Sequence, residues 1–360
     1  MDTVTKFACQ ALQQGTAALS LAHKQLANQA ADVFAPADRP AKMEVLPISE
    51  DALRQVNDRL QKLNATDIAE AERGLYPESL LFDRPWFDIA AAYPRIWLDM
   101  PGIWDRSSRK SYQEFAEGID KDGYPGYYLQ NFHYQTDGYL SDTSAELYDL
   151  QVEILFSGTA DAMRRRILAP MKTGLDRFSD VEPVDIRVLD VATGTGRTLR
   201  SLRGMLPKAK LFGLDLSPAY LRKANALLSE LPGELPQLCQ ANMEELPYRD
   251  EYFHAVSCVF TFHELPGAAR QNAIDSVYRV LKPGGTFTVC DSLQKGDVAV
   301  MDVMLENFPI VFHEPYHSNY ARDDMEARLE AAGFEAIETY DYFASKYWVA
   351  RKPEVAAEAE

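Results

Sequence analysis

The chain has 360 residues, 46% of them hydrophobic, which suffices for one large or two modest domains. Its net charge of −17 gives little electrostatic reason to bind a phosphate backbone, so no nucleic-acid partner is expected. Four cysteines without a Cys-x-x-Cys pair, no apolar run of transmembrane length and no signal-peptide core together favour a cytoplasmic protein.

The amino-terminal third predicts helices and an aromatic cap. Residues 3–31 have helical character, and a proline-containing linker follows at about 35–47. Ser49 then caps a helix whose apolar stripe predicts packing on a partner helix, within the chain or across a homodimer; the stripe comprises Leu53, Val56, Leu60 and Leu63. The stretch 82–104, crowded with aromatic residues and broken by prolines, predicts an irregular, well-packed cap.

Residues 123–141 combine many aromatic side chains with Gly, Asn and Gln. Such a surface suits a lid over an organic ligand, and an Ω-like loop packed on the main domain is the alternative. Two helical stretches follow, near 143–156 and 160–175. The run Arg164-Arg165-Arg166 is interpreted as a solvated helix face, because no basic or aromatic track extends it.

Residues 188–196 predict a short buried strand that runs into a glycine loop, with a helix after it. The glycines allow a ligand to approach the backbone, and the helix offers unpaired N–H groups. A dinucleotide fingerprint would need glycine at Leu199, and no Gly-Lys-Ser/Thr follows Gly196. Asp190 would repel a pyrophosphate but can accept hydrogen bonds from a cationic ligand, which favours a ligand with an ammonium group.

Further elements alternate downstream as strand and helix. Residues 210–217 predict a strand ending at Asp215, and Ser217-Pro218 begins a helix that extends to about 230. Asp215 lies where an acidic side chain can take ribose hydroxyls. A buried strand ends at Phe262, His263 and Glu264, and residues 281–285 form a helix stop and turn before a strand over 286–291. A helix over 325–332, closed by Gly333, and strands over 334–342 and 346–351 complete the pattern.

The motif Asp-Val-Ala-x-Gly-Thr-Gly at Asp190 resembles the first motif of class I S-adenosylmethionine-dependent methyltransferases, especially the quinone-methylating branch. The later motifs, including Leu281-Lys282-Pro283-Gly284-Gly285, follow in the family's order, and the resemblance covers roughly 184–352. It implies an α/β fold: a Rossmann-like, seven-stranded, mostly parallel sheet with an antiparallel last strand, here with a helical amino-terminal cap. We therefore expect a cap and substrate-lid region over 1–175 and a methyltransferase domain over 176–360.

The resemblance also implies S-adenosylmethionine as cofactor. In the family the stretch 240–247 holds the adenine, so Asn242 would bond the exocyclic amine and Met243 would pack near the ring. The expected cofactor-binding residues are Asp190, Ala192, Thr193, Gly194, Gly196, Asp215, Leu216, Asn242, Met243 and Phe260. The segment before the first strand commonly covers the cofactor and helps form the acceptor pocket. The expected substrate-binding residues are Tyr134, Gln135, Tyr139, Phe262, Phe312, Tyr316 and Tyr320.

A general base is needed only if the acceptor must lose a proton near neutral pH. His263 is the first candidate, followed by His313 and His317, with Glu264 as a weaker alternative; a structural role is an open alternative for each. His313 to His317 also matches the His-Glu-x-x-His zinc pattern. Pro315 disfavours the helix that this pattern requires, so no metal site is expected.

The sequence therefore predicts methyl transfer to a small, apolar or aromatic acceptor, with a prenylquinol preferred. The alternative enzyme is a methyltransferase of a secondary or polar metabolite. A degenerate cofactor-fold module that binds a partner is the alternative of another class, and the intact Asp190, Gly194, Gly196 and Asp215 speak against it.

Overall fold

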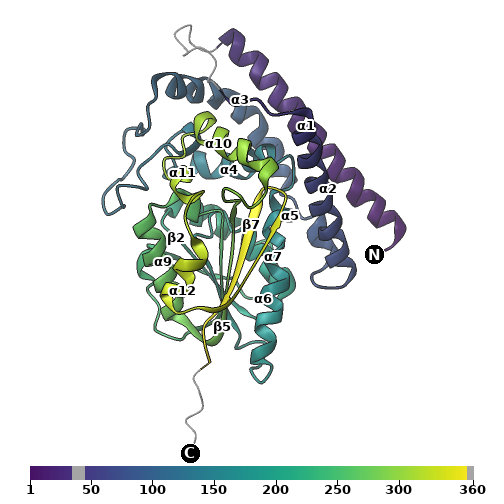
Figure 1. Cartoon of the computed structure of the whole chain (residues 1–360), viewed down its shortest axis with the longest axis vertical. Coiled ribbons are helices and arrows are strands. Elements are labelled where there is room, and N and C mark those ends of the chain that lie inside the picture. Colours follow the sequence, from purple (N-terminus) through teal and green to yellow (C-terminus); the bar gives the residue numbers. More distant parts are fainter. Residues whose placement is uncertain (35–44, 355–360) are drawn as a thin grey trace, which may run out of the picture. The chain divides into compact units, whose positions relative to one another are not determined.

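The computed structural model describes residues 1–34 and 45–354, so most of the linker predicted at 35–47 lies outside the described residues. The chain divides into two compact units (Figure 1). The first unit consists of Met1–Met163 with Val298–Ser318, and the second of Arg164–Asp297 with Asn319–Glu360. The division at 163/164 lies twelve residues before the boundary expected at 175/176, and the first unit also takes in 298–318.

The second unit is built on the predicted seven-stranded sheet, in the order β3-β2-β1-β4-β5-β7-β6. Strands β3, β2, β1, β4 and β5 are parallel, and β7 pairs antiparallel with both β5 and β6. This arrangement confirms the predicted fold class. The strands are β1 (Arg187–Val191), β2 (Lys210–Asp215), β3 (Gln237–Gln240), β4 (Phe253–Val259), β5 (Leu281–Ser292), β6 (Glu335–Tyr342) and β7 (Ser345–Arg351).

Helices cover the sheet because its central strands are apolar on both faces. Every residue of β4 is buried, as expected for a strand between two layers. Figure 1 shows α9 and α12 on one side of the sheet and α6 and α7 on the other. The helices of this unit are α6 (Leu168–Leu175), α7 (Arg197–Met205), α8 (Pro218–Leu228), α9 (Gly267–Val280) and α12 (Met325–Ala332), with short 3-10 turns η3 (Asp176–Phe178), η4 (Met243–Glu245) and η5 (Phe262–Glu264).

Local capping chemistry sets several of these boundaries as predicted. Ser217 accepts a hydrogen bond from the backbone N–H of Tyr220, and Pro218 occupies the first turn of α8. Gly333 ends α12 with a φ of 101°, a left-handed conformation that favours glycine. The turn expected over 281–285 is instead the irregular start of β5, where the register with β4 shifts and Gly284 has a φ of 76°.

The first unit is helical, as predicted. Helices α1 (Thr3–Phe34), α2 (Glu50–Glu72), α3 (Trp86–Arg109) and α4 (Asp142–Leu155) are its long elements. The shorter ones are η1 (Glu78–Leu81), η2 (Phe132–Tyr134), α5 (Ala160–Arg165), η6 (Ala299–Met301), α10 (Asp302–Val311) and α11 (His317–Tyr320), of which α5 and α11 cross into the second unit. Between α3 and α4 lies a core of Ala92, Ile96, Leu147 and Leu150.

Two expectations for the helices were wrong. The stretch 82–104 is not an irregular cap, because most of it belongs to the 24-residue helix α3 with Pro94 and Pro101 inside. Both prolines lie on the exposed side of α3, so the amphipathic packing of Ala92 and Ile96 outweighs the lost backbone hydrogen bonds. In α2, Ser49 caps the helix and Leu60 and Leu63 are buried as predicted, but Leu53 is exposed.

The arginine run at the end of α5, with Arg166 directly after the helix, is not a solvated face. Arg164, Arg165 and Arg166 are 6%, 6% and 2% exposed. The Arg164 guanidinium lies 5.5 Å from the centre of the Phe260 ring, and the carbonyl of Arg166 accepts a hydrogen bond from the Tyr340 hydroxyl. No helix in the described part of the chain is long and apolar enough to cross a membrane.

Candidate active site

Asp190 stands near the end of β1 and is fully enclosed. Its Oδ2 accepts a hydrogen bond from the Thr193 hydroxyl at 2.7 Å, and its Oδ1 accepts one from the Ser257 hydroxyl of β4, also at 2.7 Å. The side chain is 1% exposed. Asp190 therefore fixes the start of the glycine loop against β4, which is a positioning role that the sequence analysis did not foresee.

The glycine loop is joined to the end of β2 through Asp215. The backbone N–H of Gly194 donates to Asp215 Oδ2 at 2.8 Å, and the N–H of Ser217 donates to Oδ1 at 2.8 Å. Gly194 has a φ of 56°, and a Cβ built on it would meet no atom within 4 Å. Open space therefore lies directly beside the backbone of the loop, next to a carboxylate.

Two further residues around this loop have strained backbones. Ala192 follows β1 with a φ of 54°, and Phe260 follows β4 with a φ of 57°. A positive φ is costly for residues other than glycine, and such conformations cluster at ligand sites. The adjacent parallel strands thus end together at a strained edge, which is the ligand-binding edge of open α/β sheets.

The carboxyl groups of Asp190 and Asp215 have pKa values well above the ordinary value for aspartate. Burial raises the pKa of Asp190 to about 7, against the opposing hydrogen bonds from Ser257 and Thr193. Burial also raises the pKa of Asp215 to about 6, against the hydrogen bonds from the backbone N–H groups of Ser217 and Gly194. Desolvated carboxylates beside open space favour a ligand that brings a positive charge or hydroxyl donors.

The residues expected at the adenine directly follow β3, which is the neighbour of β2 in the sheet. Asn242 caps η4, because its Oδ1 accepts from the N–H of Glu244 at 3.0 Å and its Nδ2 donates to the Glu244 carboxylate at 3.2 Å. Met243 is buried at 5% exposure. The carbonyl of Leu216 accepts a hydrogen bond from the Gln240 side chain. The adenine roles of these residues stay predictions.

His263 belongs to a histidine–aspartate pair at the end of β4 and β5. Its Nδ1 lies 2.6 Å from Asp291 Oδ1, and the Asp291 side chain is fully buried. Asp291 also accepts hydrogen bonds from the N–H groups of Thr261, Phe262 and Ser292. Although burial alone would raise the pKa of Asp291, the charge of the His263 ring and these hydrogen bonds hold it below its ordinary value.

Asp291 is a site residue that the sequence analysis missed. The signal was present, because Asp291 comes at the end of a predicted strand, as Asp190 and Asp215 do. A carboxylate that binds one ring nitrogen of a histidine sets its tautomer and orientation. Asp291 therefore holds the His263 ring by its Nδ1, and a role of His263 as a general base stays a prediction.

The other candidates of the second unit surround this pair. Glu264 Oε1 lies 4.0 Å from His263 Nε2. The Tyr320 ring packs edge-on against His263 with centroids 6.3 Å apart, and its hydroxyl donates to the carbonyl of Ser292. Phe262 is fully buried against Phe287. Tyr320 therefore supports the histidine ring from the protein core. The contact of Phe262 and Tyr320 with a substrate stays a prediction.

In the first unit, the aromatic loop and the segment 308–318 lie together. The N–H of His133 donates to the carbonyl of His313 at 3.1 Å, and the Tyr112 ring stacks on the His313 ring with centroids 4.0 Å apart. Tyr134 packs against His313, and Tyr127 against Tyr316. The two regions expected to contact the acceptor are therefore neighbours, although about 180 residues separate them.

The remaining candidates of this unit are mostly enclosed. Gln135 is 5% exposed, and its Nε2 has no hydrogen-bond partner in the part of the chain that the structure describes. Tyr139 packs against Phe132. His317 is buried against Phe308. Burial lowers the pKa of His313, whose Nε2 lies 3.1 Å from the side-chain oxygen of Gln130.

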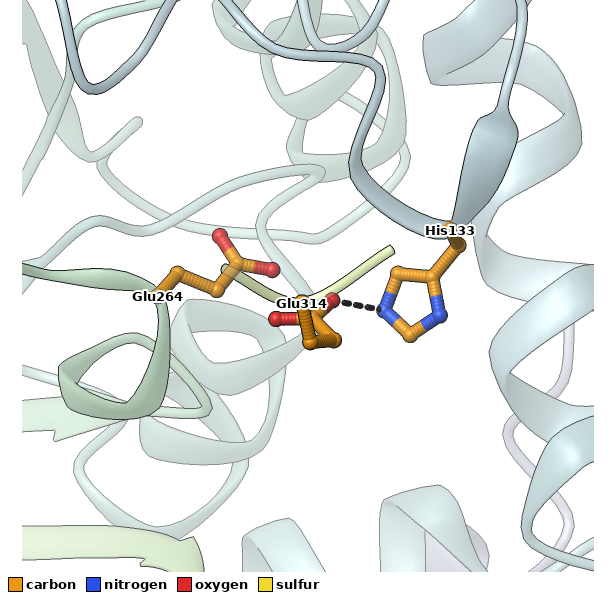
Figure 2. A group of neighbouring side chains, drawn as sticks. All are labelled: His133, Glu264 and Glu314. Atoms are coloured by element: carbon orange, nitrogen blue, oxygen red, sulfur yellow. Dashed lines mark ion pairs between the residues drawn. The ribbon is translucent and has the colours of Figure 1, made fainter. Parts of the chain in front are cut away.

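The zinc pattern at His313 to His317 does not form a helical face. Helix α10 ends at Val311 and α11 begins at His317, so Glu314 and Pro315 lie in the irregular connection between them. Glu314 is instead paired with His133, and its Oε1 lies 2.8 Å from His133 Nε2 (Figure 2). This pair was not predicted, although Glu314 lies in the His-Glu-x-x-His pattern and His133 in the aromatic stretch 123–141, because 180 residues separate the two in the sequence.

Comparison with known proteins now decides the class of the second unit. Residues 188–285 match the family model described as a methyltransferase domain. The chain contains a class I S-adenosylmethionine-dependent methyltransferase domain. This confirms the family and the cofactor predicted from the sequence. The desolvated Asp215 and the open space at Gly194 fit such a cofactor, which brings ribose hydroxyls.

The relatives of this methyltransferase domain are named for different methyltransferase activities. The chain is 32% identical over 151 residues to the ubiquinone/menaquinone biosynthesis C-methyltransferase UbiE of Desulfotalea psychrophila, covering 42% of this chain and 56% of the relative. It is 33% identical to a demethylmenaquinone methyltransferase of Thermus thermophilus (41% and 61%) and 32% identical to a malonyl-[acyl-carrier protein] O-methyltransferase of Geobacter sulfurreducens (45% and 59%). The chain thus spans little more than half the length of these relatives.

Among solved structures, a SAM-dependent methyltransferase from Aquifex aeolicus is similar at 22% identity and a TM-score of 0.39. That similarity covers 53% of this chain and 94% of the other.

Proposed function

We propose that the chain is an enzyme that transfers the methyl group of S-adenosylmethionine to a small organic acceptor. The observation that supports this most directly is the intact edge of the sheet, where Gly194 leaves open space beside the desolvated carboxyl of Asp215. Asp215 would bind the ribose hydroxyls, and the stretch at Asn242 and Met243 would hold the adenine. Burying carboxyl groups lowers the stability of a fold, so a domain that no longer bound the cofactor would be more stable without them.

The bound cofactor would supply an already activated sulfonium methyl group. The chain's own residues would then position the acceptor, exclude water and hold its proton. His263 is the base that we propose, because Asp291 can accept a hydrogen bond from its Nδ1–H, which leaves the basic lone pair on Nε2. A base placed in this way contributes about 10²- to 10⁴-fold to the rate.

The acceptor that we propose is aromatic and largely apolar, with a prenylated quinol preferred. The rings gathered around His133 and His313 support this choice, as do the quinone-methylating relatives. A secondary or polar metabolite is the alternative, and the O-methyltransferase relative supports it. The net charge of −17 supports a protein without a nucleic-acid partner, and four cysteine thiols support a reducing, cytoplasmic compartment.

Isothermal titration calorimetry with S-adenosylmethionine tests this function. We expect the wild-type protein to bind it, and Asp215→Ala to bind it at least tenfold more weakly because two ribose hydroxyls lose their acceptor (about 1.4 kcal/mol or more). Asp185→Ala is the matched control, since this exposed aspartate precedes β1 and pairs with Lys210. No binding to the wild type at millimolar cofactor, or an unchanged affinity in Asp215→Ala, would contradict the proposal.

A further inference from the structure

Arg270 of α9 is a fully buried cation. Its guanidinium donates to three oxygen atoms. Nε donates to the carbonyl of Leu265 at 3.0 Å, and the two terminal nitrogens donate to Asn319 Oδ1 at 2.5 Å and to the Asp323 carboxylate. A buried ion pair is often no more stabilising than apolar side chains of the same volume, so packing alone does not explain a guanidinium at this position.

The partners of Arg270 lie on two segments of the second unit that are far apart in the sequence. Leu265 directly follows the turn η5, which carries His263. The other two partners belong to the segment 319–323, which also carries Tyr320. A guanidinium presents its donors in a rigid planar fork, so Arg270 can hold the turn and this segment in a fixed relation to each other.

Tyr320 connects this arrangement to the candidate base. The centre of its ring lies 5.7 Å from the guanidinium carbon of Arg270, and the same ring packs edge-on against His263 with centroids 6.3 Å apart. Its hydroxyl donates to the carbonyl of Ser292 at 2.7 Å, directly after Asp291 in the chain. The His263 ring is therefore bound at Nδ1 by Asp291 and supported by the fully buried Tyr320 ring.

Other side chains hold the segment 319–323 to neighbouring elements. Gln294 Nε2 donates to the carbonyls of Tyr320 at 2.8 Å and of Asp323 at 2.5 Å. Arg328 Nε of α12 donates to the Asp323 carboxylate at 2.7 Å. These bonds fix the segment to the end of β5 and to α12, whereas Arg270 ties it to the turn that carries the histidine.

We propose that Arg270 is a positioning residue for His263, which keeps the histidine turn and the Tyr320 ring together so that the His263 ring stays in the orientation set by Asp291. Groups that hold a functional histidine from behind fix its orientation and which ring nitrogen carries the proton. This inference rests on the proposed function, in which His263 is the base. Arg270 acts through Leu265 and Tyr320, without touching the cofactor or the acceptor.

Nuclear magnetic resonance of the His263 Nδ1–H proton tests this role in the full-length protein, labelled with ¹⁵N-histidine. The signal is assigned by its absence in His263→Gln. A ring proton that is bonded to the buried Asp291 carboxylate exchanges slowly with water only while the ring stays in place. We expect a protected proton in the wild type and an exchange rate at least tenfold higher in Arg270→Met, because the turn and the Tyr320 segment are then no longer tied together.

Arg279→Met is the matched control. Arg279 lies on the same helix, and its guanidinium donates to the carbonyls of Leu246 and Tyr248, which belong neither to the histidine turn nor to the segment 319–323. Its loss removes comparable hydrogen bonds from α9. The exchange of the His263 proton should stay as it is in the wild type.

Two further variants separate positioning from a general loss of stability. Arg270→Lys keeps the charge and loses the planar fork, so its exchange rate should lie between those of the wild type and Arg270→Met; it also replaces Arg270→Met if that variant does not fold. Tyr320→Leu should accelerate the exchange as well. The double variant Arg270→Met, Tyr320→Leu should exchange no faster than the faster single variant, since both act through one contact.

Several results would overturn the inference: an unprotected proton in the wild type, an unchanged rate in both Arg270 variants, an equal acceleration in Arg279→Met, or a double variant that exchanges faster than either single one. The affinity for S-adenosylhomocysteine, measured by calorimetry, reports separately on the proposed function. A wild type that binds this compound and leaves the His263 proton unprotected therefore loses the positioning role of Arg270 and keeps the methyltransferase function.

Discussion

Three aspartates end three strands of the parallel part of the sheet, and each carboxyl has a different use. Asp190 accepts two side-chain hydroxyls, Asp215 accepts backbone N–H groups of the glycine loop and its neighbour, and Asp291 accepts a histidine. The sequence predicted the first two from their spacing to the glycines. It did not predict Asp291, because the pairing of β4 with β5 brings Asp291 to His263, and that pairing is a tertiary feature.

Removal of Asp291 should cost more stability than removal of His263. Asp291→Ala leaves three backbone N–H groups without their acceptor, whereas His263→Ala removes one partner and keeps these bonds. We expect a loss of about 3 kcal/mol in the free energy of unfolding for Asp291→Ala and about 1 kcal/mol for His263→Ala. Urea denaturation measures both, and an equal or larger loss in His263→Ala would show that Asp291 does not organise this end of the sheet.

The raised pKa of Asp190 predicts how stability depends on pH. Its pKa of about 7 in the folded protein exceeds the value of ~3.9 expected in the unfolded chain. The contribution of this carboxyl is therefore complete below the unfolded pKa and is lost as the pH rises through the folded pKa. The stability of the wild type relative to Asp190→Asn should fall between about pH 4 and pH 7.

Denaturation of both proteins at several pH values measures this difference. Asp185→Asn is the control with the opposite sign, because a hydrogen bond from Lys210 lowers the pKa of Asp185. The stability of the wild type relative to Asp185→Asn should stay level from pH 5 to pH 7. A difference between wild type and Asp190→Asn that rises with pH would contradict the assignment.

At the scale of elements, the helix ends that depend on nearby capping groups were predicted most accurately from the sequence. The start of α8 at Ser217-Pro218 and the end of α12 at Gly333 follow from capping groups within a few residues. The prediction from sequence failed where tertiary packing outweighs the helix propensity or the polarity of single residues. Helix α3 continues through Pro94 because its other face is buried on α4, and the arginines of α5 are buried by partners that lie far away in the sequence.

At the scale of the molecule, the candidate acceptor region was identified only in pieces. Residues of the aromatic loop and, far from them in the sequence, Phe312 and Tyr316 were each predicted to contact a substrate, and the structure places 308–318 against the aromatic loop in the first unit. Five of the seven strands, β1 to β5, lie between these two segments in the sequence, so no local pattern could reveal their contact. The His133–Glu314 pair depends on this contact, which explains why it was missed.

The predicted homodimer stays a proposal, and α1 offers a specific surface for it. Leu19, Leu26 and Val33 are spaced seven residues apart, and Val4 lies on the same side of an ideal helix. All four side chains are at least half exposed. A second copy of this helix would bury the stripe, because a heptad spacing matches the seam of a two-helix coiled coil.

Light scattering after size-exclusion chromatography measures the mass of the particle. We expect a dimer for the wild type and a monomer for the double variant Leu19→Glu, Leu26→Glu, since two buried charges at the seam would repel their copies. Gln14→Glu with Gln25→Glu is the control for added charge on other exposed positions of α1. A monomeric wild type, or a double variant that stays dimeric, would show that α1 does not join two copies.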